Sequence, residues 1–306
     1  MKVMVFDVGG TEIKYSVMDE QMHRTSSGAV PTPQDTQAQF LDTVYRLYAP
    51  HKDEVTGIAM ALPGFVDNHT GYVSNGGALL YNTATPVGQL LAEKCGCPVM
   101  LENDGKAAAM AELANGALKG CCNAAVFIIG TGVGGGIIAN GQLVRGVHFT
   151  AGEYSFVNTN AEAWDAPDQN MACQCSTSNL LKWYRARKAL PEDAPLDGRS
   201  FFAAANAGEP EALEVLRRFC HAVAVQIYNL TVLLDVEKVA IGGGISKQPL
   251  LLESLRSAYD GLYASRAGQA YMEGLPRCQI VPCAFSSEAN QVGVAAAYFE
   301  AMQKKC

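Results

Sequence analysis

The chain has 306 residues, of which 49% are apolar and 17% charged, and its formal net charge is −7. This composition is typical of a folded soluble protein and excludes a largely disordered chain, while the length is sufficient for two domains. The acidic balance, with no basic block longer than Lys304-Lys305, argues against a nucleic-acid partner.

The sequence predicts neither a leader peptide nor a membrane span. Only one lysine precedes the apolar residues 3–6, and no small-residue cleavage site follows a long apolar run, so we expect no signal peptide. The most apolar stretch, 222–236, includes Gln226, Asn229 and Asp235, which predicts a buried helix. Without a secretion signal, the ten cysteines are expected to be reduced thiols. We therefore expect a cytoplasmic location and no membrane partner.

The first part of the chain alternates predicted strands and helices. Residues 3–8 read as a strand, and the alternation of Ile13, Tyr15 and Val17 with polar neighbours predicts a second strand in a hairpin. A helix is expected around 40–47, ended by Pro50, and a buried strand over 55–62, stopped by Pro63-Gly64. Helices over 86–95 and 107–118 flank a short strand at 99–101.

The same order then recurs. A strand at 124–129, a glycine-rich turn and a strand at 137–139 are followed by Asn140-Gly141, a type I′ hairpin signal that leads to residues 143–144. Residues 159–172 lack periodicity and are expected to be irregular. Further helices are predicted at 178–190, 199–207, 210–235, 249–263 and 288–304, and strands at 236–241 and 278–282.

Because strand, glycine turn and strand occur from residue 3 and again from residue 124, the sequence indicates two related lobes. We place the N-terminal lobe at 1–117, completed by the C-terminal helix within 288–306, and the C-terminal lobe at 118–287.

Three glycine-rich turns are the most informative pattern. Glycine lets several backbone N–H groups approach an anion, as in phosphate loops. Asp7-Val8-Gly9-Gly10-Thr11 adds a carboxylate that can hold Mg²⁺ through water and a hydroxyl for a phosphate oxygen, although an ordinary hairpin turn would read alike. Residues 130–136 contain five glycines, more than a hairpin needs. Gly242-Gly243-Gly244 allows either an adenosine lying flat or tight strand–helix packing. None of these turns is a Walker A motif.

Asn103-Asp104 lies between a predicted strand and a predicted helix. Capping of the helix, worth about 1 kcal/mol, is one explanation. The other is that Asp104 accepts a proton from a hydroxyl that attacks a γ-phosphoryl group, because phosphoryl transfer uses in-line positioning and a modest general base. The two roles are compatible, since the helix dipole favours an ionised carboxylate at this position.

These motifs together resemble the ROK family of sugar kinases over nearly the whole chain. The matching residues, in order, are Asp7-x-Gly-Gly-Thr11, Pro63-Gly64-x-Val66-Asp67, Glu102-Asn103-Asp104, Gly130-Thr-Gly-x-Gly-Gly-Gly136, Ala151-Gly152-Glu153 and Gly242-Gly243-Gly244. The resemblance implies an α/β, two-lobed actin-like ATPase (ribonuclease H-like) fold with a cleft between the lobes. It also implies transfer of the γ-phosphoryl of Mg-ATP to a sugar hydroxyl, usually at C6, and a homodimer.

The resemblance also assigns roles to individual residues. Asp104 resembles the catalytic base, Asn103 a sugar ligand, and Glu153 the carboxylate that binds hydroxyls near the anomeric end. The expected sugar-binding residues are Gly64, Asn75, Gly76, Gly77, Asn103, Asp104, Glu153 and Phe156. The expected nucleotide-binding residues are Asp7, Gly9, Gly10, Thr11, Lys14, Gly130, Thr131, Gly132, Gly134, Gly135, Gly242, Gly243 and Gly244, with Asp7 also holding Mg²⁺ through water.

The chain departs from the family pattern where many members bind structural zinc. Ser155 and Phe156 replace the Gly-His that often follows Ala-Gly-Glu-x, and only Cys173 and Cys175 remain of three cysteines, the third position being Leu180. Structural zinc takes four ligands, so we predict that none is bound.

Two departures from the family pattern, at Phe156 and at Lys182, bear on the substrate. Phe156 replaces the histidine and Lys182 a glutamate where the C1 and C2 hydroxyls are read. Phe156 could stack on an aglycone or a second sugar, or only fill the space left by the missing zinc site. The glycine-rich residues 74–79 resemble the equivalent stretch of bacterial β-glucoside kinases. We therefore expect 6-phosphorylation of glucose or a β-glucoside.

Other functions stay open at this point. The alternatives are an N-acetylmannosamine or other hexose kinase of the same family, a non-catalytic sugar-sensing ROK regulator, and an actin-like structural protein. Such regulators carry a winged helix ahead of the first phosphate loop, which here begins at residue 7. A structural protein would not need Glu102-Asn103-Asp104 or Ala151-Gly152-Glu153.

Overall fold

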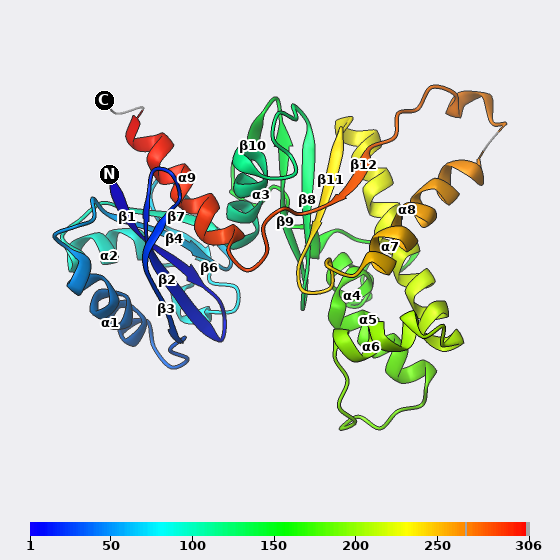
Figure 1. Cartoon of the computed structure of the whole chain (residues 1–306), viewed down its shortest axis with the longest axis horizontal. Coiled ribbons are helices and arrows are strands. Elements are labelled where there is room, and N and C mark those ends of the chain that lie inside the picture. Colours follow the sequence, from blue (N-terminus) through cyan, green and yellow to red (C-terminus); the bar gives the residue numbers. More distant parts are fainter. Residues whose placement is uncertain (267, 304–306) are drawn as a thin grey trace. The chain divides into compact units, whose positions relative to one another are not determined.

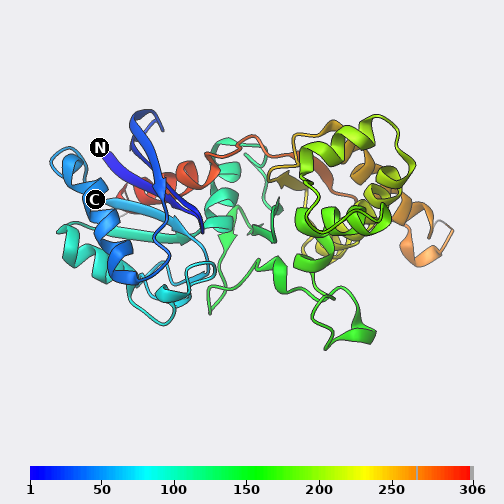
Figure 2. The ribbon, with the colours of Figure 1, turned by 90° about the horizontal axis from the view of Figure 1, so that it is seen from below.

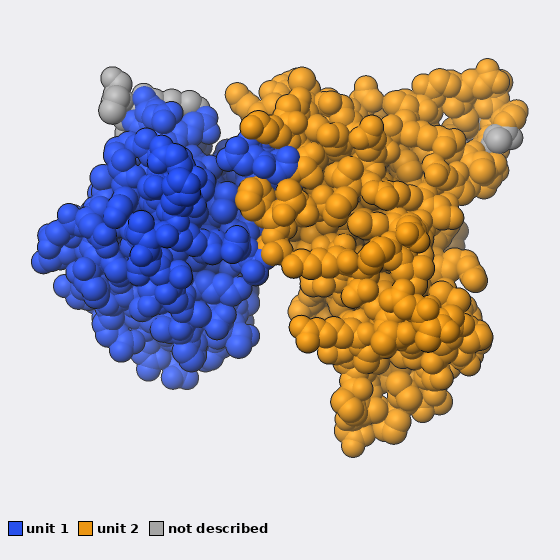
Figure 3. Space-filling view, viewed as in Figure 1, with its two compact units in different colours: residues 1–116, 143–151, 287–306 blue, residues 117–142, 152–286 orange. Residues whose placement is uncertain are grey.

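The computed structural model describes residues 1–266 and 268–303, which form two compact units (Figures 1 and 3). Unit 1 contains Met1–Gly116, Leu143–Ala151 and the described residues from Ser287 onward. Unit 2 contains Ala117–Gln142 and Gly152–Ser286. Residues 143–151, which the predicted lobe boundaries place in the C-terminal lobe, pack with unit 1. The end of the N-terminal lobe's predicted helix, 304–306, lies outside the described residues.

Unit 1 is built on a five-stranded sheet with the order β3-β2-β1-β4-β7. An antiparallel hairpin joins β1 to β2, and β4 and β7 run parallel to β1. The strands are β1 (Lys2–Val8), β2 (Glu12–Asp19), β3 (Arg24–Pro31), β4 (Ile58–Leu62) and β7 (Val99–Asn103). A separate two-stranded sheet is formed by β5 (Phe65–Val66) and β6 (Val73–Asn75).

The helices of unit 1 bury the sheet (Figures 1 and 2). Met4 and Phe6 of β1 share one apolar core with Phe40 of α1 and Leu91 of α2. α3 packs against α9, which also contacts β1 and β4. The helices are α1 (Gln37–Tyr48), α2 (Val87–Cys95), α3 (Asp104–Asn115) and α9 (Ala289–Gln303), with short 3₁₀ turns η1 (Ala49–His51) and η2 (Leu80–Asn82).

Unit 2 repeats the topology, with the strand order β10-β9-β8-β11-β12. β8 pairs with β9 in an antiparallel hairpin and with β11 in parallel, as β1 pairs with β2 and β4. The strands of this sheet are β8 (Ala124–Ile129), β9 (Val133–Ala139), β10 (Gln142–Val144), β11 (Lys238–Gly242) and β12 (Gln279–Pro282). Of β10, only Gln142 is assigned to unit 2, because Leu143 and Val144 belong to the segment assigned to unit 1. The expected repetition of strand, glycine turn and strand is therefore present.

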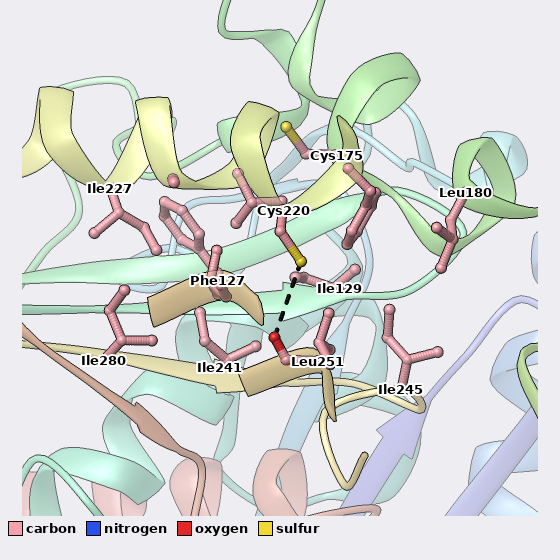
Figure 4. Close-up of a cluster of buried hydrophobic side chains, with 14 of the residues drawn as sticks. Phe127, Ile129, Cys175, Leu180, Cys220, Ile227, Ile241, Ile245, Leu251 and Ile280 are labelled. Atoms are coloured by element: carbon pink, nitrogen blue, oxygen red, sulfur yellow. Dashed lines mark hydrogen bonds between the residues drawn. The ribbon is translucent and has the colours of Figure 1, made fainter. Parts of the chain in front are cut away.

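A large apolar core joins the sheet of unit 2 to its helices. Figure 4 shows Phe127 and Ile129 of β8 facing Cys220 and Ile227 of α7, and the Cys220 thiol lies 3.9 Å from the Leu251 carbonyl oxygen. The helices are α4 (Met171–Cys175), α5 (Thr177–Arg187), α6 (Gly198–Asn206), α7 (Pro210–Leu234) and α8 (Pro249–Ala264), with 3₁₀ turns η3 (Tyr154–Phe156), η4 (Ala161–Ala163) and η5 (Ala270–Met272).

Most predicted elements are present, and three differences have clear physical causes. β3 was not predicted because its sequence, Arg-Thr-Ser-Ser-Gly-Ala-Val-Pro, is polar and mostly exposed along one side. β9 begins at Val133 rather than 137, because its glycines continue the strand. α3 begins at Asp104 rather than 107, because Asn103 caps it. The predicted end of the last helix, Lys304, lies outside the described residues.

Two expectations about the environment can be compared with the described residues. Over residues 1–266 and 268–303, no helix combines the length and apolarity needed to cross a membrane. The cysteines within these ranges are all free thiols.

Candidate functional site

Three parallel strands of unit 1 end at the same edge of the sheet. Asp7 of β1 pairs with Ala61 of β4, which in turn pairs with Glu102 of β7. The carboxyl ends of parallel strands meet at one edge, where ligands commonly bind in open α/β sheets. The register therefore brings Asp7, Gly64 and the Asn103–Asp104 pair, all predicted from separate motifs, to one edge of unit 1.

Polar side chains hold the first glycine turn in unit 1. The Gly9 N–H donates to the Glu12 carbonyl at 2.9 Å, which closes the β1–β2 hairpin. The Thr32 hydroxyl donates to the Gly9 carbonyl, and the Gln34 amide to the Gly10 carbonyl, each at 2.7 Å. Thr32 and Gln34 were not predicted, because nothing in their local sequence indicates that they return to this turn.

Asp7 is held by a residue from the other end of the chain. The Asn290 amide donates to Asp7 Oδ1 at 2.8 Å, and Lys14 lies opposite Asp7 in the β1–β2 register. Burial raises the pKa of the Asp7 carboxyl, while the Asn290 hydrogen bond and the positive charge of Lys14 act in the opposite direction. A single carboxylate at a strand end fits Mg²⁺ held through water, because Mg²⁺ keeps several of its waters when it binds few protein ligands.

Asn103 links the start of α3 to the chain segment after β4. Its Oδ1 accepts a hydrogen bond from the Lys106 N–H at 3.0 Å, which is an N-cap, and its amide donates to the Gly64 carbonyl at 2.9 Å. Asp104 is the first residue of α3, and its Oδ1 accepts from the Gly105 N–H at 2.7 Å. The capping role that the sequence left open therefore belongs to Asn103, while Asp104 occupies the first turn.

The predicted sugar-binding glycines surround Gly64. Gly64 has a φ of +98°, and a Cβ there would collide with the Asn75 carbonyl oxygen, so only glycine fits this approach. Asn75 Oδ1 accepts from the Gly77 N–H at 2.8 Å, and the Gly76 N–H donates to the Thr83 hydroxyl at 3.0 Å. Through Asn103 and Gly64, the structure brings the unit 1 members of the predicted sugar-binding set together.

A buried ion pair lies directly behind the Asn103–Asp104 pair. Arg145 Nε and Nη2 lie 2.9 and 2.8 Å from Glu102 Oε2, and the side chains of Arg145 and Glu102 are 26% and 2% exposed. Glu102 Oε1 accepts from the Asn103 N–H at 3.1 Å. Sequence reasoning missed Arg145, because a charge pair 43 residues apart leaves no local signal.

In unit 2, the second and third glycine turns adjoin. Gly242 pairs with Ile128 at the ends of two parallel strands, so the turns that follow β8 and β11 leave the same edge. Gly243 has a φ of +95°, and a Cβ there would collide with the Ile129 carbonyl oxygen, just before Gly130. The Thr177 N–H donates to the Gly130 carbonyl at 2.8 Å. Two of the predicted nucleotide-binding segments are thus side by side within one unit.

The 3₁₀ turn η3 lies beside the same hairpin and carries the unit 2 residues of the predicted sugar site. Glu153 precedes η3 and Phe156 ends it, and Phe156 is 70% exposed. The buried Tyr154 donates its hydroxyl proton to the Gly136 carbonyl at 3.1 Å. Ser155 is bonded to Val133, the first residue of β9. Thr131 and Gly134 are the exposed positions of this hairpin.

The zinc motif is replaced by ordinary packing. Cys175 and Leu180 are buried in the core of unit 2, and burial raises the pKa of the Cys175 thiol to about 12. The Cys173 thiol lies 3.7 Å from the Pro167 carbonyl oxygen. Within the described part of the chain, no three His, Cys, Asp or Glu residues are grouped so that they could hold a metal. The expectation that no zinc is bound stays a prediction.

The chain is similar to a known protein family and to proteins of known function. A model described as the ROK family matches residues 3–303. A β-glucoside kinase from Listeria innocua is 30% identical over 258 residues, 84% of this chain and 87% of its own length. An N-acetyl-D-glucosamine kinase from Vibrio atlanticus is 30% identical over 277 residues, 82% of this chain and 86% of its own.

A solved structure supports the same relationship. The ROK family protein from Streptococcus pneumoniae, in complex with sucrose, is 27% identical, with a TM-score of 0.86 over 99% of this chain and 100% of that chain. This likeness confirms the predicted α/β fold of the actin-like ATPases.

Proposed function

The chain belongs to the ROK family and is a sugar kinase, and we propose that it transfers the γ-phosphoryl of Mg-ATP to the 6-hydroxyl of a β-glucoside or of glucose. The enzyme class, a phosphotransferase with an alcohol group as acceptor, follows from the kinases to which it is similar. The assignment of residues and the choice of sugar are proposals.

One observation carries the assignment of the acceptor site. The 2.9 Å hydrogen bond from the Asn103 amide to the Gly64 carbonyl holds the first turn of α3, with Asp104, next to the glycine-rich residues 74–79. Each polar atom of the Asn103 amide can make a second hydrogen bond, so its capping role leaves capacity for a sugar hydroxyl.

In the proposed reaction, the 6-hydroxyl oxygen forms a bond to the γ-phosphorus while its proton passes to the Asp104 carboxylate. The bond between the γ-phosphorus and the oxygen that bridges it to the β-phosphorus breaks, and its electron pair leaves with ADP. The helix dipole favours negative charge in the first turn, which suits a carboxylate that acts as a general base. The backbone N–H groups of the glycine turns would bind the phosphate oxygens.

Asp7 would hold Mg²⁺ through water, and the bound ion would neutralise charge on the phosphate oxygens. The Asn290 amide orients the Asp7 carboxylate for this contact. Phosphoryl transfer depends mainly on such positioning and charge stabilisation.

The proposed preference for a β-glucoside depends on Phe156. Phe156 is 70% exposed, which disfavours the view that it only fills the space of a missing zinc site. An exposed ring three residues after Glu153 can instead stack on the apolar face of an aglycone or second sugar. The Listeria innocua relative is a β-glucoside kinase, which supports an acceptor with a substituent at C1. The Streptococcus pneumoniae protein is in complex with sucrose, a disaccharide whose glucose is α-linked, so it supports a second sugar ring but not the β linkage.

A panel of acceptors tests the proposal. With Mg-ATP as donor, initial rates on glucose, cellobiose, N-acetylglucosamine and N-acetylmannosamine should be highest for glucose or cellobiose, and ³¹P–¹H correlation should place the phosphate on O6. A clear preference for either acetamido sugar would overturn the choice of substrate. Phosphorylation at another hydroxyl would overturn the assigned site of transfer.

The homodimer that the resemblance implies, and the cytoplasmic location expected from the sequence without a signal peptide, stay predictions. Sedimentation of the purified chain would decide the first.

A further inference from the structure

The Ser155 hydroxyl makes two hydrogen bonds to the same residue of the β8–β9 hairpin. Ser155 Oγ accepts from the Val133 N–H and donates to the Val133 carbonyl, both at 3.1 Å. A hydroxyl can do this because it carries one donor and two acceptor positions, whereas glycine and alanine side chains carry neither. Val133 directly follows the Gly130–Gly132 turn, in which the Gly130 N–H donates to the Gly132 carbonyl.

Hydrogen bonds therefore join η3 to the hairpin at two places: at Val133, which precedes the run of three glycines at 134–136, and at Gly136, which ends it. Besides the bonds of Ser155 to Val133, the Tyr154 hydroxyl donates to the Gly136 carbonyl at 3.1 Å. The Tyr154 ring also packs edge-on against Phe127 of β8, with 4.5 Å between the ring centroids. Tyr154 is buried, so it anchors η3 to the core, while Ser155 is half-buried and joins η3 to the rim of the turn.

Ser155 thus connects a segment proposed to bind the sugar with a turn proposed to bind phosphate. Glu153 and Phe156, on either side of it, are the proposed sugar contacts of unit 2, and Gly130–Gly132, beyond Val133, is the proposed phosphate turn. Glycine often stands at this position in the ROK pattern and has no hydroxyl, so the link depends on the serine that this chain carries there.

We propose that Ser155 is a positioning residue that couples sugar binding at Glu153 and Phe156 to nucleotide binding at the Gly130–Gly132 turn. A sugar that fixes η3 also fixes the Ser155 hydroxyl, which holds the N–H and C=O of Val133 and so restricts the turn before it. The first ligand to bind then bears the entropy cost of ordering the turn, so the second ligand binds more tightly than it would alone. The inference rests on the proposed function of the two segments.

Calorimetry on the whole chain measures this coupling directly. The dissociation constant of a non-hydrolysable ATP analogue with Mg²⁺ is measured alone and with saturating glucose or cellobiose, and the ratio of the two values gives the coupling. In the unmodified protein we expect a ratio of at least about 5, and the same ratio for the sugar with and without the analogue, because coupling is reciprocal. In Ser155→Ala and Ser155→Gly the ratio should fall to about 1–2, with the affinity for the analogue alone changed less than about threefold.

Ser200 provides a matched control in the same unit. Its hydroxyl accepts from the Asp197 N–H at 3.0 Å and donates to the Asp197 carbonyl at 2.9 Å, so Ser200→Ala removes the same two kinds of hydrogen bond at the start of α6. This variant should keep the full coupling ratio. Ser155→Thr, which retains a hydroxyl, should restore the ratio at least in part.

The coupling ratio tests the role of Ser155, and sugar turnover tests the proposed function, so the two claims can fail independently. A ratio of about 1 in the unmodified protein, an unchanged ratio in both Ser155 variants, or an equal decrease in Ser200→Ala would each overturn the role of Ser155. Turnover of sugars by the unmodified protein is measured separately. A failure of turnover would count against the proposed function, whereas the coupling ratio alone decides the inference about Ser155.

Discussion

Arg145 pairs with Glu102, the residue that directly precedes Asn103 and Asp104, through two nitrogen–oxygen distances of 2.9 and 2.8 Å. Glu102 also accepts a hydrogen bond from the Asn103 N–H. The Arg145 guanidinium therefore stabilises, through Glu102, the backbone at the start of α3, where the proposed base Asp104 lies. Arg145 belongs to Leu143–Ala151, the segment that packs with unit 1 although its neighbours along the chain belong to unit 2.

Removing this guanidinium should reduce both stability and turnover. Arg145→Met leaves a nearly fully buried carboxylate without its cation, a change that costs about 3–5 kcal/mol at full burial, and the 26% exposure of Arg145 places the expected value near the lower end. A shift of the Asn103 backbone should also lower kcat by about 10- to 100-fold, since a 1 Å misplacement can cost that much. Urea unfolding and steady-state kinetics measure the two effects.

A neutral pair and a surface pair serve as controls for Arg145. Glu102→Gln combined with Arg145→Met keeps an acceptor for the Asn103 N–H and should recover part of the stability. Arg187→Met breaks a 2.8 Å pair with Glu214 whose side chains are about half exposed, and should change the stability far less than Arg145→Met, because exposed ion pairs contribute little. Equal losses in Arg145→Met and Arg187→Met would contradict a special role for the buried pair.

The base assigned to Asp104 is tested by Asp104→Asn. The amide keeps the shape of the carboxylate and an acceptor for the Gly105 N–H, so the melting temperature should change little. Because a general base contributes about 10²–10⁴-fold, kcat should fall by at least the lower figure while the affinity for the ATP analogue is kept. Glu211→Gln, at another first helical turn, should leave kcat unchanged. Near-normal turnover by Asp104→Asn would remove Asp104 from this role.

The pKa of Asp67 gives a prediction about pH and stability. Burial raises this pKa, but hydrogen bonds from the Thr70 hydroxyl and the His69 and Thr70 N–H groups outweigh it, so the net pKa lies below its ordinary value. A carboxyl with a lowered folded-state pKa stabilises the fold above the unfolded value of about 3.9, and this contribution is lost as the pH falls through the folded value.

Asp67→Asn should therefore lower the melting temperature at pH 7 by about 2–4 °C. This is the shift that a loss of about 1 kcal/mol in the free energy of unfolding produces in domains of about 150–250 residues. The difference from the unmodified protein should shrink below about pH 4 and vanish at lower pH. Scanning calorimetry across this range tests the sign: a difference that grows as the pH falls would show that the ionised form of Asp67 does not stabilise the fold.

Local sequence patterns were enough to predict the elements that carry the site. The type I′ signal at Asn140-Gly141 is confirmed by φ values of +53° and +70°, and the helices predicted from periodicity begin and end within a few residues of α5, α6 and α7. The parallel register of β1, β4 and β7 then places motifs that are far apart in sequence at one edge.

The contacts that hold those motifs in place could not be predicted in the same way. Asn290 bonds to Asp7 across 283 positions of the chain, and Arg145 to Glu102 across 43. Thr32 and Gln34 reach the first glycine turn only because the polar strand β3, whose sequence lacks apolar alternation, brings them back to it. Such pairings depend on the tertiary path of the chain, about which local periodicity carries no information.

Phe156→Ala tests whether the exposed ring selects the acceptor. Stacking on a second sugar or aglycone would be worth about 0.5–1.5 kcal/mol, so kcat/KM for cellobiose should fall about 2- to 12-fold. The value for glucose, which has no second ring, should change little, because Glu153, Asn103 and Asp104 are unaltered. Trp164→Ala removes the ring of a residue that is 77% exposed at the end of η4, and should alter neither value. Equal losses on glucose and cellobiose would mean that Phe156 supports the shape of η3 rather than contacting the substituent at C1.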